Sequence, residues 1–335
     1  MIKTFLTFDY ELYFGNNYVS EEKVLFEPTN KILKIAKDLN IKLVFFIDIM
    51  SVLAYKKYNQ SDYVEQFTSQ VKDMISLGHN VEFHFHPHWI DSVYENGKWQ
   101  HKFENWSHSN LIDNLGKQKA DSLFDKAYNL FIDMVGKQPI CFRAGGYTVQ
   151  PYEKELIKLL RKYDFKYDSS ITPYKKFISD AQVFDFLECE EFNFWEINNN
   201  TFLKQGNNSI VEFPILSVKK DFDILIKYAI LKLINKLDIE KGDFIKRGKG
   251  ATLQPKEYKN HAILCSFDMI LNKDKKIMKF IIKEYIKKFK QNDIVYLNIL
   301  SHPKAIFKES LEVMEWYIDY MNSKYNNIFI GFDDI

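Results

Sequence analysis

The sequence predicts an α/β fold that is built on a parallel sheet or barrel. Segments typical of strands and of helices alternate four times between residues 2 and 163, as they do in successive strand–helix–strand units. Residues 41–48 form a nearly continuous apolar run, which is typical of a strand that is buried on both faces of a parallel sheet. A chain of 335 residues is long enough for one barrel domain, so we expect residues 1–335 to form a single domain.

The expected elements follow from hydrophobic periodicity and from residues that end helices. The helix expected at 62–77 stops at Gly78, a typical C-terminal glycine. The other helices are expected at 29–39, 117–135, 151–163, 275–290 and 307–322, with a helix-rich segment at 219–245 and a long loop at 89–109. Strands are expected at 2–8, 41–48, 139–144, 165–168, 183–188, 193–198, 210–217, 261–267, 294–300 and 327–332, and one more before Pro87.

Charge and cysteine content exclude several classes of protein. The formal net charge of +1 excludes a nucleic-acid binder held by overall electrostatics. Cys141, Cys189 and Cys265 are far apart, which indicates reduced thiols rather than a disulfide framework. The N-terminus has no pattern of a signal peptide, and no apolar segment reaches transmembrane length. We therefore expect a cytoplasmic protein.

Three histidines lie within five positions at the end of one expected strand. Alternation along a strand places His84 and His86 on the same face. Pro87 should end the strand, so that the following turn can bring His88 back toward His84. Imidazoles are the commonest metal ligands in proteins, and a pair of this spacing is typical of chelation. The alternative is a solvated, histidine-rich strand end.

Other ionisable side chains also lie at the ends of expected strands. Asp9 and Glu11 end the first strand and, two positions apart, share a face; Arg143 and His302 end two later strands. The carboxyl ends of parallel barrel strands form one reaction face. We therefore expect these groups to meet the histidines there.

Four motifs occur in order along the chain. They are an acidic motif at Thr7–Glu11, Gly78-His79 with the histidines at 84–88, an arginine motif at Phe142–Tyr147, and a late histidine motif at Leu300–Pro303. In these motifs and their order the chain resembles the NodB-type polysaccharide deacetylases, carbohydrate esterase family four. The resemblance implies a distorted (β/α) barrel of about seven strands. In this chain we expect the barrel to carry a helical, basic insertion at about 219–260 in the C-terminal half.

The resemblance also implies a divalent metal ion, such as Zn²⁺, held by one carboxylate and two imidazoles. Carried over to this chain, the metal ligands would be Glu11, His84 and His88. The catalytic residues would be Asp9 as general base, Arg143 as the group that orients and charge-pairs Asp9, and His302 as general acid.

This chain departs from the family's usual pattern in two places. The family has two adjacent aspartates, whereas Tyr10 separates Asp9 from Glu11 here, so either acid could be the metal ligand. The usual arginine motif has prolines and a tyrosine where this chain has residues 144–146. A backbone N–H near Gly146 or Tyr147 is expected to serve as an oxyanion donor.

Further residues are candidates for contact with a substrate. His86 is expected to point in the same direction as His84, and Asp48 ends an expected strand. Trp89 begins the long loop, and its ring could stack on a sugar ring. A helix cap for Asp48 and a core position for Trp89 are the alternatives.

These residues suit the hydrolysis of an amide, and the resemblance implies removal of an N-acetyl group from an amino sugar. The expected substrate is an N-acetylated sugar or glycan, or its lipid-linked or nucleotide-linked precursor, in surface polysaccharide assembly. One alternative is a C–N hydrolase of a small amide or cyclic imide on the same barrel. Another is a metal-free, inactive carbohydrate-binding relative.

One segment differs in charge from the rest of the chain. Residues 219–290 hold 19 Lys and Arg against 9 Asp and Glu, a net charge of +10. Such a segment could contact an anionic membrane or the pyrophosphate of a lipid-linked sugar. A solvated face of amphipathic helices is the more frequent explanation.

Overall fold

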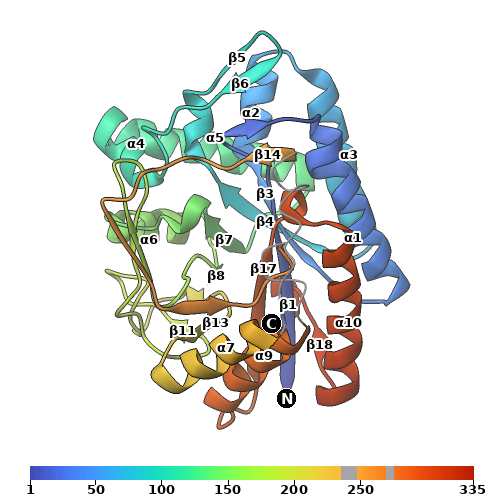
Figure 1. The fold of residues 1–335 in the computed structure, drawn as a ribbon. Helices are drawn as coiled ribbons and strands as arrows, with labels where there is room; N and C mark the ends of the chain where they lie inside the picture. Colours follow the sequence, from blue (N-terminus) through green and yellow to red (C-terminus); the bar gives the residue numbers. More distant parts are fainter. Residues whose placement is uncertain (235–246, 269–274) are drawn as a thin grey trace.

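The computed structural model describes residues 1–234, 247–268 and 275–335, in which one curled sheet is surrounded by helices (Figure 1). The sheet has nine strands in the order β11-β12-β8-β7-β4-β3-β1-β17, with β18 beside β1. Its strands are β1 (Ile2–Tyr10), β3 (Val44–Asp48), β4 (Asn80–Phe85), β7 (Cys141–Ala144), β8 (Tyr167–Asp168), β11 (Trp195–Glu196), β12 (Val211–Glu212), β17 (Val295–Ser301) and β18 (Ile328–Phe329). All neighbours pair in parallel except β11 with β12.

The sheet closes into a distorted barrel without a regular ladder between its edges. The backbone N–H of Leu216 donates to the carbonyl of Asn298 in β17 (2.7 Å), and the Asn298 amide donates to the carbonyl of Phe213 (2.7 Å). Asn193 exchanges two hydrogen bonds with the backbone of Tyr296, also in β17. These contacts join β17 to the segments around β11 and β12, so the predicted distorted α/β barrel is confirmed.

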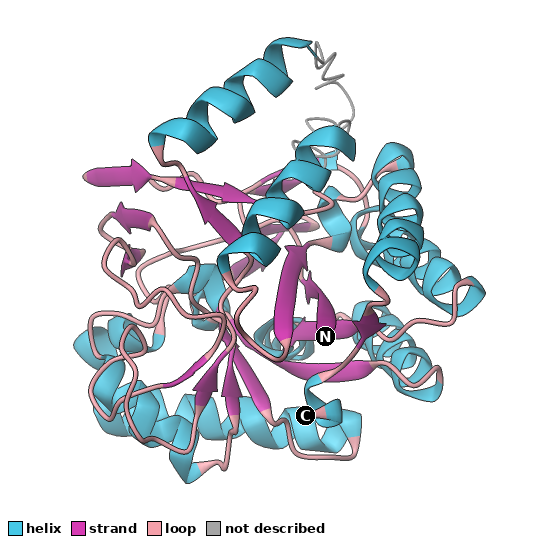
Figure 2. Ribbon diagram, turned by 90° about the horizontal axis from the view of Figure 1, so that it is seen from below, coloured by secondary structure: helices cyan, strands magenta, loops and turns pink. Residues whose placement is uncertain are grey.

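Helices cover the outside of the barrel (Figure 2). They are α1 (Glu27–Asp38), α2 (Ile49–Lys57), α3 (Ser61–Ser76), α4 (His108–Leu115), α5 (Lys117–Val135), α6 (Glu153–Lys162), α7 (Phe222–Ile234), α9 (Lys275–Lys288) and α10 (Lys308–Tyr325). The bounds of α5 are those expected from the sequence. Helix α2 was not expected, because the apolar run of β3 continues into it after Asp48 and hides the boundary.

The segment expected to be a long loop contains regular structure. After a 3₁₀ turn at Pro87–Ile90, β5 (Val93–Glu95) and β6 (Lys98–Gln100) form a hairpin. The aromatic side chains of this segment pack together, with the rings of Trp89 and Trp99 5.0 Å apart at their centroids.

The basic segment returns to the mouth of the barrel after α7. There β14 (Gly248–Lys249) pairs with β2 (Asn16–Asn17), and β15 (Glu257–Asn260) pairs with β9 (Lys175–Ile178). β9 also pairs with β10 (Val183–Asp185), whereas β13 (Ser217–Lys219) pairs with β16 (Ala262–Leu264). Of the expected insertion at about 219–260, residues 235–246 lie outside the described residues.

Candidate active site

Two acidic side chains enter the site from the carboxyl end of β1. Asp9 and Glu11 are buried, with 4% and 5% of their surface exposed. Tyr10 between them points to the other face, where its hydroxyl donates to Gln70 Oε1 (2.6 Å) and its ring packs on Phe67. The spacing of the two acids therefore follows from strand alternation, which sends every second side chain inward.

Three side chains bring metal-binding atoms together at this point. Glu11 Oε2 lies 2.6 Å from His86 Nε2 and 3.1 Å from His84 Nε2, and the two imidazole nitrogens are 3.0 Å apart. All three side chains are buried, and their donor atoms lie within 4.8 Å of one another. One carboxylate with two imidazoles is the donor set of a class of catalytic zinc sites.

The tautomer of His84 is fixed by a backbone contact. Its Nδ1 lies 2.9 Å from the carbonyl oxygen of Arg143, to which it donates. Its other nitrogen, Nε2, faces Glu11 and His86. Such a hydrogen bond from the second nitrogen is typical of metal-binding histidines.

The cluster differs in one member from the expected ligand set, because it contains His86 and not His88. Strand alternation carries on through His86 after β4, whereas His88 is turned away by the 3₁₀ turn at Pro87–Ile90. The His88 ring stacks on Trp106, with centroids 5.1 Å apart. Neither of its nitrogens has a hydrogen-bond partner within the described part of the chain, and burial lowers the pKa of His88 well below its usual value.

Arg143 holds Asp9 in place. Its Nη1 donates to Asp9 Oδ1 (2.7 Å) and to Thr7 Oγ1 (3.0 Å). Its other nitrogens donate to the carbonyl and the hydroxyl of Ser169, and its guanidinium lies 3.9 Å from the ring centre of Phe46. The side chain is fully buried, so this charge acts on Asp9 without screening by water.

The charges around the two acids keep both ionised. Burial raises the pKa of Asp9, but the charges of Arg143, His84 and His302 outweigh this effect and hold it below its usual value. Burial also raises the pKa of Glu11, but the charge of Lys304 and the hydrogen bonds to His84 and His86 bring it well below the usual value. Burial lowers the pKa of His86 to about 4, which leaves its imidazole neutral and able to bind a metal ion.

His302 faces the acids from the end of β17. Its Nε2 is 3.7 Å from Asp9 Oδ2 and 3.8 Å from Glu11 Oε1. Its Nδ1 and its backbone N–H both donate to Asp268, each at 2.8 Å. Burial lowers the pKa of His302, but the charge of Asp268 and the hydrogen bond to it raise the pKa above its usual value.

Two residues at this site were not expected from the sequence. Asp268 orients His302, and it follows the expected strand at 261–267 just as Asp9 follows the first strand, so the same signal could have found it. Lys304 donates to Glu11 Oε1 (2.6 Å) and to the carbonyl of Leu12 (2.9 Å). Its position just after Pro303 carries no pattern that singles it out.

The polar groups open into a cavity of about 290 Å³ at the mouth of the barrel. Trp106, Gly146, Tyr147 and Phe177 also line it. The segment 250–253, which follows β14, supplies a further wall. The cavity therefore brings together Asp9, Glu11, His84, His86 and His302 from three separate strands, as the convergence of strand ends predicts.

Two expected substrate contacts lie outside this cavity. Asp48 is fully buried, and the indole N–H of Trp89 donates to its Oδ2 (2.6 Å). Trp89 is only 1% exposed. Asp48 ends β3, and burial raises its pKa to about 7. Neither side chain lines the cavity, and the two contact each other instead.

No protein-family model matches the chain, and no curated protein matches its sequence. Solved structures match over almost its whole length. The chain is similar to Puue allantoinase, with a TM-score of 0.51 and 12% identity over 99% of this chain and 87% of the other. It is also similar to a chain assigned as a polysaccharide deacetylase from Mycobacterium smegmatis, with a TM-score of 0.48 and 12% identity over 99% of this chain and 88% of the other. A third similar structure is the polysaccharide deacetylase Bc1974 from Bacillus cereus, with a TM-score of 0.40 and 13% identity over 99% of this chain and 94% of the other.

The likeness to the allantoinase shows that the two chains share a fold.

Proposed function

We propose that the chain is a metal-dependent hydrolase that removes the N-acetyl group from an amino sugar. The observation that carries the proposal is the placement of Glu11, His84 and His86 beside the ion pair of Asp9 and Arg143. His302 faces them across the same cavity. The residues thus supply a metal site, a base and an acid in one place, as amide hydrolysis requires.

Glu11, His84 and His86 would hold the metal ion. The fit rests on the buried carboxylate, on the Nε2 atoms of His84 and His86 that face it, and on the backbone contact that orients His84. A divalent ion such as Zn²⁺ bound there would polarise the substrate carbonyl and lower the pKa of water. We assign Glu11 rather than Asp9 as the carboxylate ligand, because Asp9 Oδ1 already accepts a hydrogen bond from Arg143.

The protein's own groups would carry the protons. Asp9, kept ionised by Arg143, accepts a proton from the water that attacks the acetamido carbon. His302 holds a proton because of Asp268 and gives it to the amide nitrogen as the C–N bond breaks. The products are acetate and the free amine of the sugar.

The cavity also has groups that suit the oxyanion and the sugar. Gly146 and Tyr147 line it, and a backbone N–H there would stabilise the oxyanion by about 3–4 kcal/mol. Trp106 and Phe177 offer aromatic faces to a sugar ring. A role in surface polysaccharide assembly, a lipid-linked or nucleotide-linked substrate, a cytoplasmic location and the single-domain organisation stay predictions from the sequence.

The main test is acetate release from N-acetylhexosamine compounds by protein loaded with metal, compared with protein treated with a chelator. We expect release that depends on the metal. Stoichiometric metal with no release from any N-acetylated sugar would contradict the proposal.

A second candidate is a C–N hydrolase of a small amide or cyclic imide, which the shared fold with an allantoinase favours. Ring opening or ammonia release in the same assay, without acetate release, would select this candidate. Sugar binding without any bound metal would instead select an inactive carbohydrate-binding protein.

A further inference from the structure

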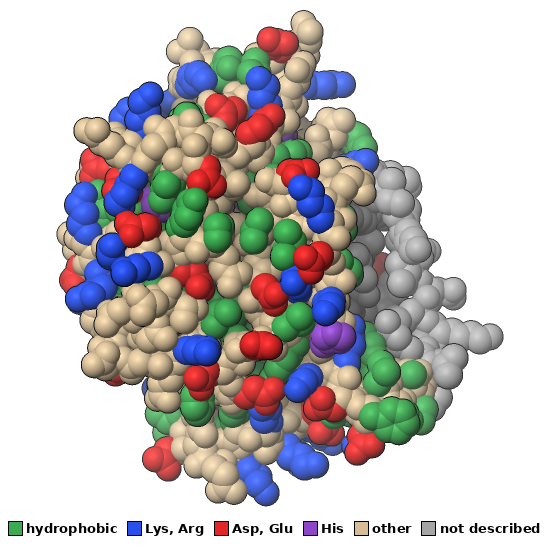
Figure 3. Space-filling view, turned by 90° about the vertical axis from the view of Figure 1, so that its left-hand side faces the viewer, with side chains coloured by type: hydrophobic (Ala, Val, Ile, Leu, Met, Phe, Trp, Pro, Cys, Tyr) green, Lys and Arg blue, Asp and Glu red, His purple; other side chains and the backbone are tan. Residues whose placement is uncertain are grey.

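Helix α7 is apolar on two opposite sides. Ile224, Tyr228 and Leu231 face inward and pack against the hydrophobic core. On the outer side, Phe222 is 76% exposed, and Leu225, Ile226 and Ile230 are between 43% and 48% exposed. These four positions have the spacing of one helix face. Figure 3 shows apolar side chains gathered on the lower right of that view.

An exposed apolar stripe of this kind marks a site of contact. Single exposed apolar residues are normal, but contiguous patches on one element indicate a partner or a membrane. A helix that is hydrophobic all round is expected to be buried on all sides. The outer face of α7 therefore lacks an apolar surface to cover it among the described residues.

The elements that carry and adjoin this stripe are rich in lysine. Residues 219–234 and 275–288 together contain ten lysines and three carboxylates, Asp221, Asp223 and Glu284. Helix α9, which carries six of these lysines, packs against α7.

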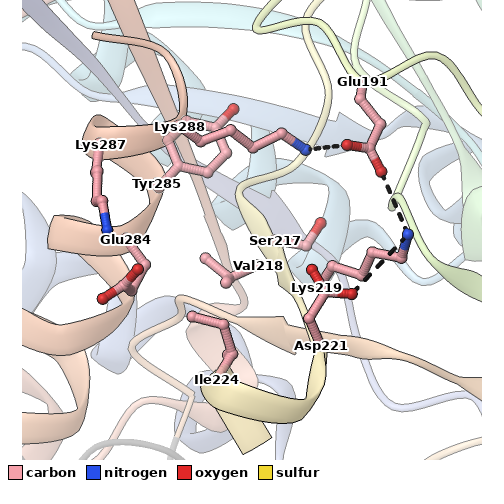
Figure 4. Close-up of a pocket in the computed structure, with 10 residues that line it drawn as sticks. All are labelled: Glu191, Ser217, Val218, Lys219, Asp221, Ile224, Glu284, Tyr285, Lys287 and Lys288. Atoms are coloured by element: carbon pink, nitrogen blue, oxygen red, sulfur yellow. Dashed lines mark hydrogen bonds and ion pairs between the residues drawn. The ribbon is translucent and has the colours of Figure 1, made fainter. Parts of the chain in front are cut away.

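A pocket of about 290 Å³ lies where β13, α7 and α9 meet, and Lys219, Lys287 and Lys288 line it (Figure 4). Glu191 offsets part of this charge, since it lies 2.7 Å from Lys288 and 3.7 Å from Lys219. Lys227 lies 4.0 Å from Glu284. Lysines remain in clear excess, so an anionic surface is the complementary partner.

We propose that the outer face of α7 lies on the surface of a bilayer that contains anionic lipids. A bilayer offers acyl chains to the apolar stripe and anionic headgroups to the lysines beside it, which a purely apolar or purely acidic protein surface would not. The 13 residues of α7 extend over about 20 Å, less than the ~30 Å of a bilayer core. Within the described ranges, no helix is both long and apolar enough to cross a membrane. Helix α7 would therefore lie in the plane of the interface.

The surface is separate from the proposed active site. In Figure 1, α7 lies at the height of the N-terminal part of β1, whereas Asp9 lies near the other end of that strand. Binding to a bilayer would leave the cavity open. The proposal thus stands or falls independently of the deacetylase activity.

The test uses the full chain and co-sedimentation with phosphatidylcholine vesicles, with and without phosphatidylglycerol. We expect binding to the vesicles that contain phosphatidylglycerol, weakened by salt, and little binding to phosphatidylcholine alone. The variant Leu225→Gln/Ile230→Gln should bind these vesicles at least about tenfold more weakly, since it removes apolar contact with the acyl chains.

The matched control is Leu77→Gln/Ile328→Gln, which removes a leucine and an isoleucine that are 40% and 47% exposed, compared with 45% and 48% for Leu225 and Ile230. It should bind as the unmodified chain does, and both variants should keep the metal content and the thermal unfolding temperature of the unmodified chain. No binding to either vesicle, or equal binding by both double variants, would overturn the proposal. A dimer that Leu225→Gln/Ile230→Gln alone dissociates, without vesicle binding, would assign the face to a second copy of the chain instead.

Discussion

Gly145 lies so close to His86 that a Cβ atom at position 145 would be 2.4 Å from the Nδ1 atom of the imidazole. The next nearest atoms, at 2.6 and 2.7 Å, belong to the same ring. A real Cβ does not approach that closely, so any larger residue at position 145 would displace the ring. The glycine that follows β7 therefore allows His86 to reach Glu11.

The first prediction follows from this contact. Gly145→Ala should weaken metal binding about 10- to 100-fold, the range seen when groups that support a metal ligand are changed. Competition with a chelating dye would measure the affinity. Gly250→Ala is the matched control, because Gly250 also lines the cavity and a Cβ there would meet nothing within 4 Å. Equal affinities for both variants would show that His86 is not held by this contact.

The second prediction separates the two histidines that flank Pro87. His86→Phe and His88→Phe each keep a buried aromatic ring and remove its nitrogens. We expect His86→Phe to lose stoichiometric metal and His88→Phe to keep it, since only His86 faces Glu11 and His84. Elemental analysis gives the metal content.

Thermal unfolding with and without added metal provides a readout that does not depend on activity. Metal at about 100 times its dissociation constant should stabilise the unmodified chain by about 2.7 kcal/mol, and His88→Phe by the same amount. The reverse outcome, with metal lost from His88→Phe and kept by His86→Phe, would restore the ligand set expected from the sequence.

Much of the site could be predicted because the strands are parallel. The carboxyl ends of β1, β4 and β17 meet at one edge, so Asp9, Glu11, His84 and His302 lie together. The choice between His86 and His88 depends on where the backbone turns after Pro87 and on the ring of Trp106. Those are tertiary contacts that the spacing of the histidines does not reveal.

The same reasoning explains two further differences. Asp48 also lies at the end of a strand, yet its side chain turns toward the indole of Trp89 instead of the cavity. Lys304 comes close to Glu11 only because the 3₁₀ turn that follows His302 folds back over β1. Strand-end residues can therefore be found from sequence, whereas the direction of their side chains needs the neighbouring elements.

The third prediction concerns the proposed base. Asp9→Asn keeps the shape of the side chain and leaves Glu11, His84 and His86 in place, so we expect metal binding to persist. Turnover should fall about 10²- to 10⁴-fold, because the amide cannot accept the proton of the attacking water. Acetate release and elemental analysis on the same sample check both statements. An Asp9→Asn variant as active as the unmodified chain would mean that another group is the base.

The last prediction concerns two carboxyl groups behind the site, Asp168 in β8 and Glu212 in β12. They are paired in register and fully buried. Burial raises the pKa of both, and for Glu212 the charge of Asp168 raises it further, well above the usual value. The folded chain therefore keeps a proton that the unfolded chain releases once the pH exceeds the ordinary carboxyl pKa.

It follows that the free energy of unfolding decreases as the pH rises from the ordinary pKa of Glu212 toward its raised value. The slope is up to about 1.4 kcal/mol per pH unit for one proton. Glu212→Gln removes this proton, so its free energy of unfolding should change less between about pH 5 and pH 7. Urea unfolding of chelator-treated protein at a series of pH values measures it, with the exposed Glu196→Gln on the neighbouring strand β11 as control. Parallel curves for the unmodified chain and Glu212→Gln would mean that Glu212 is already ionised in the folded protein.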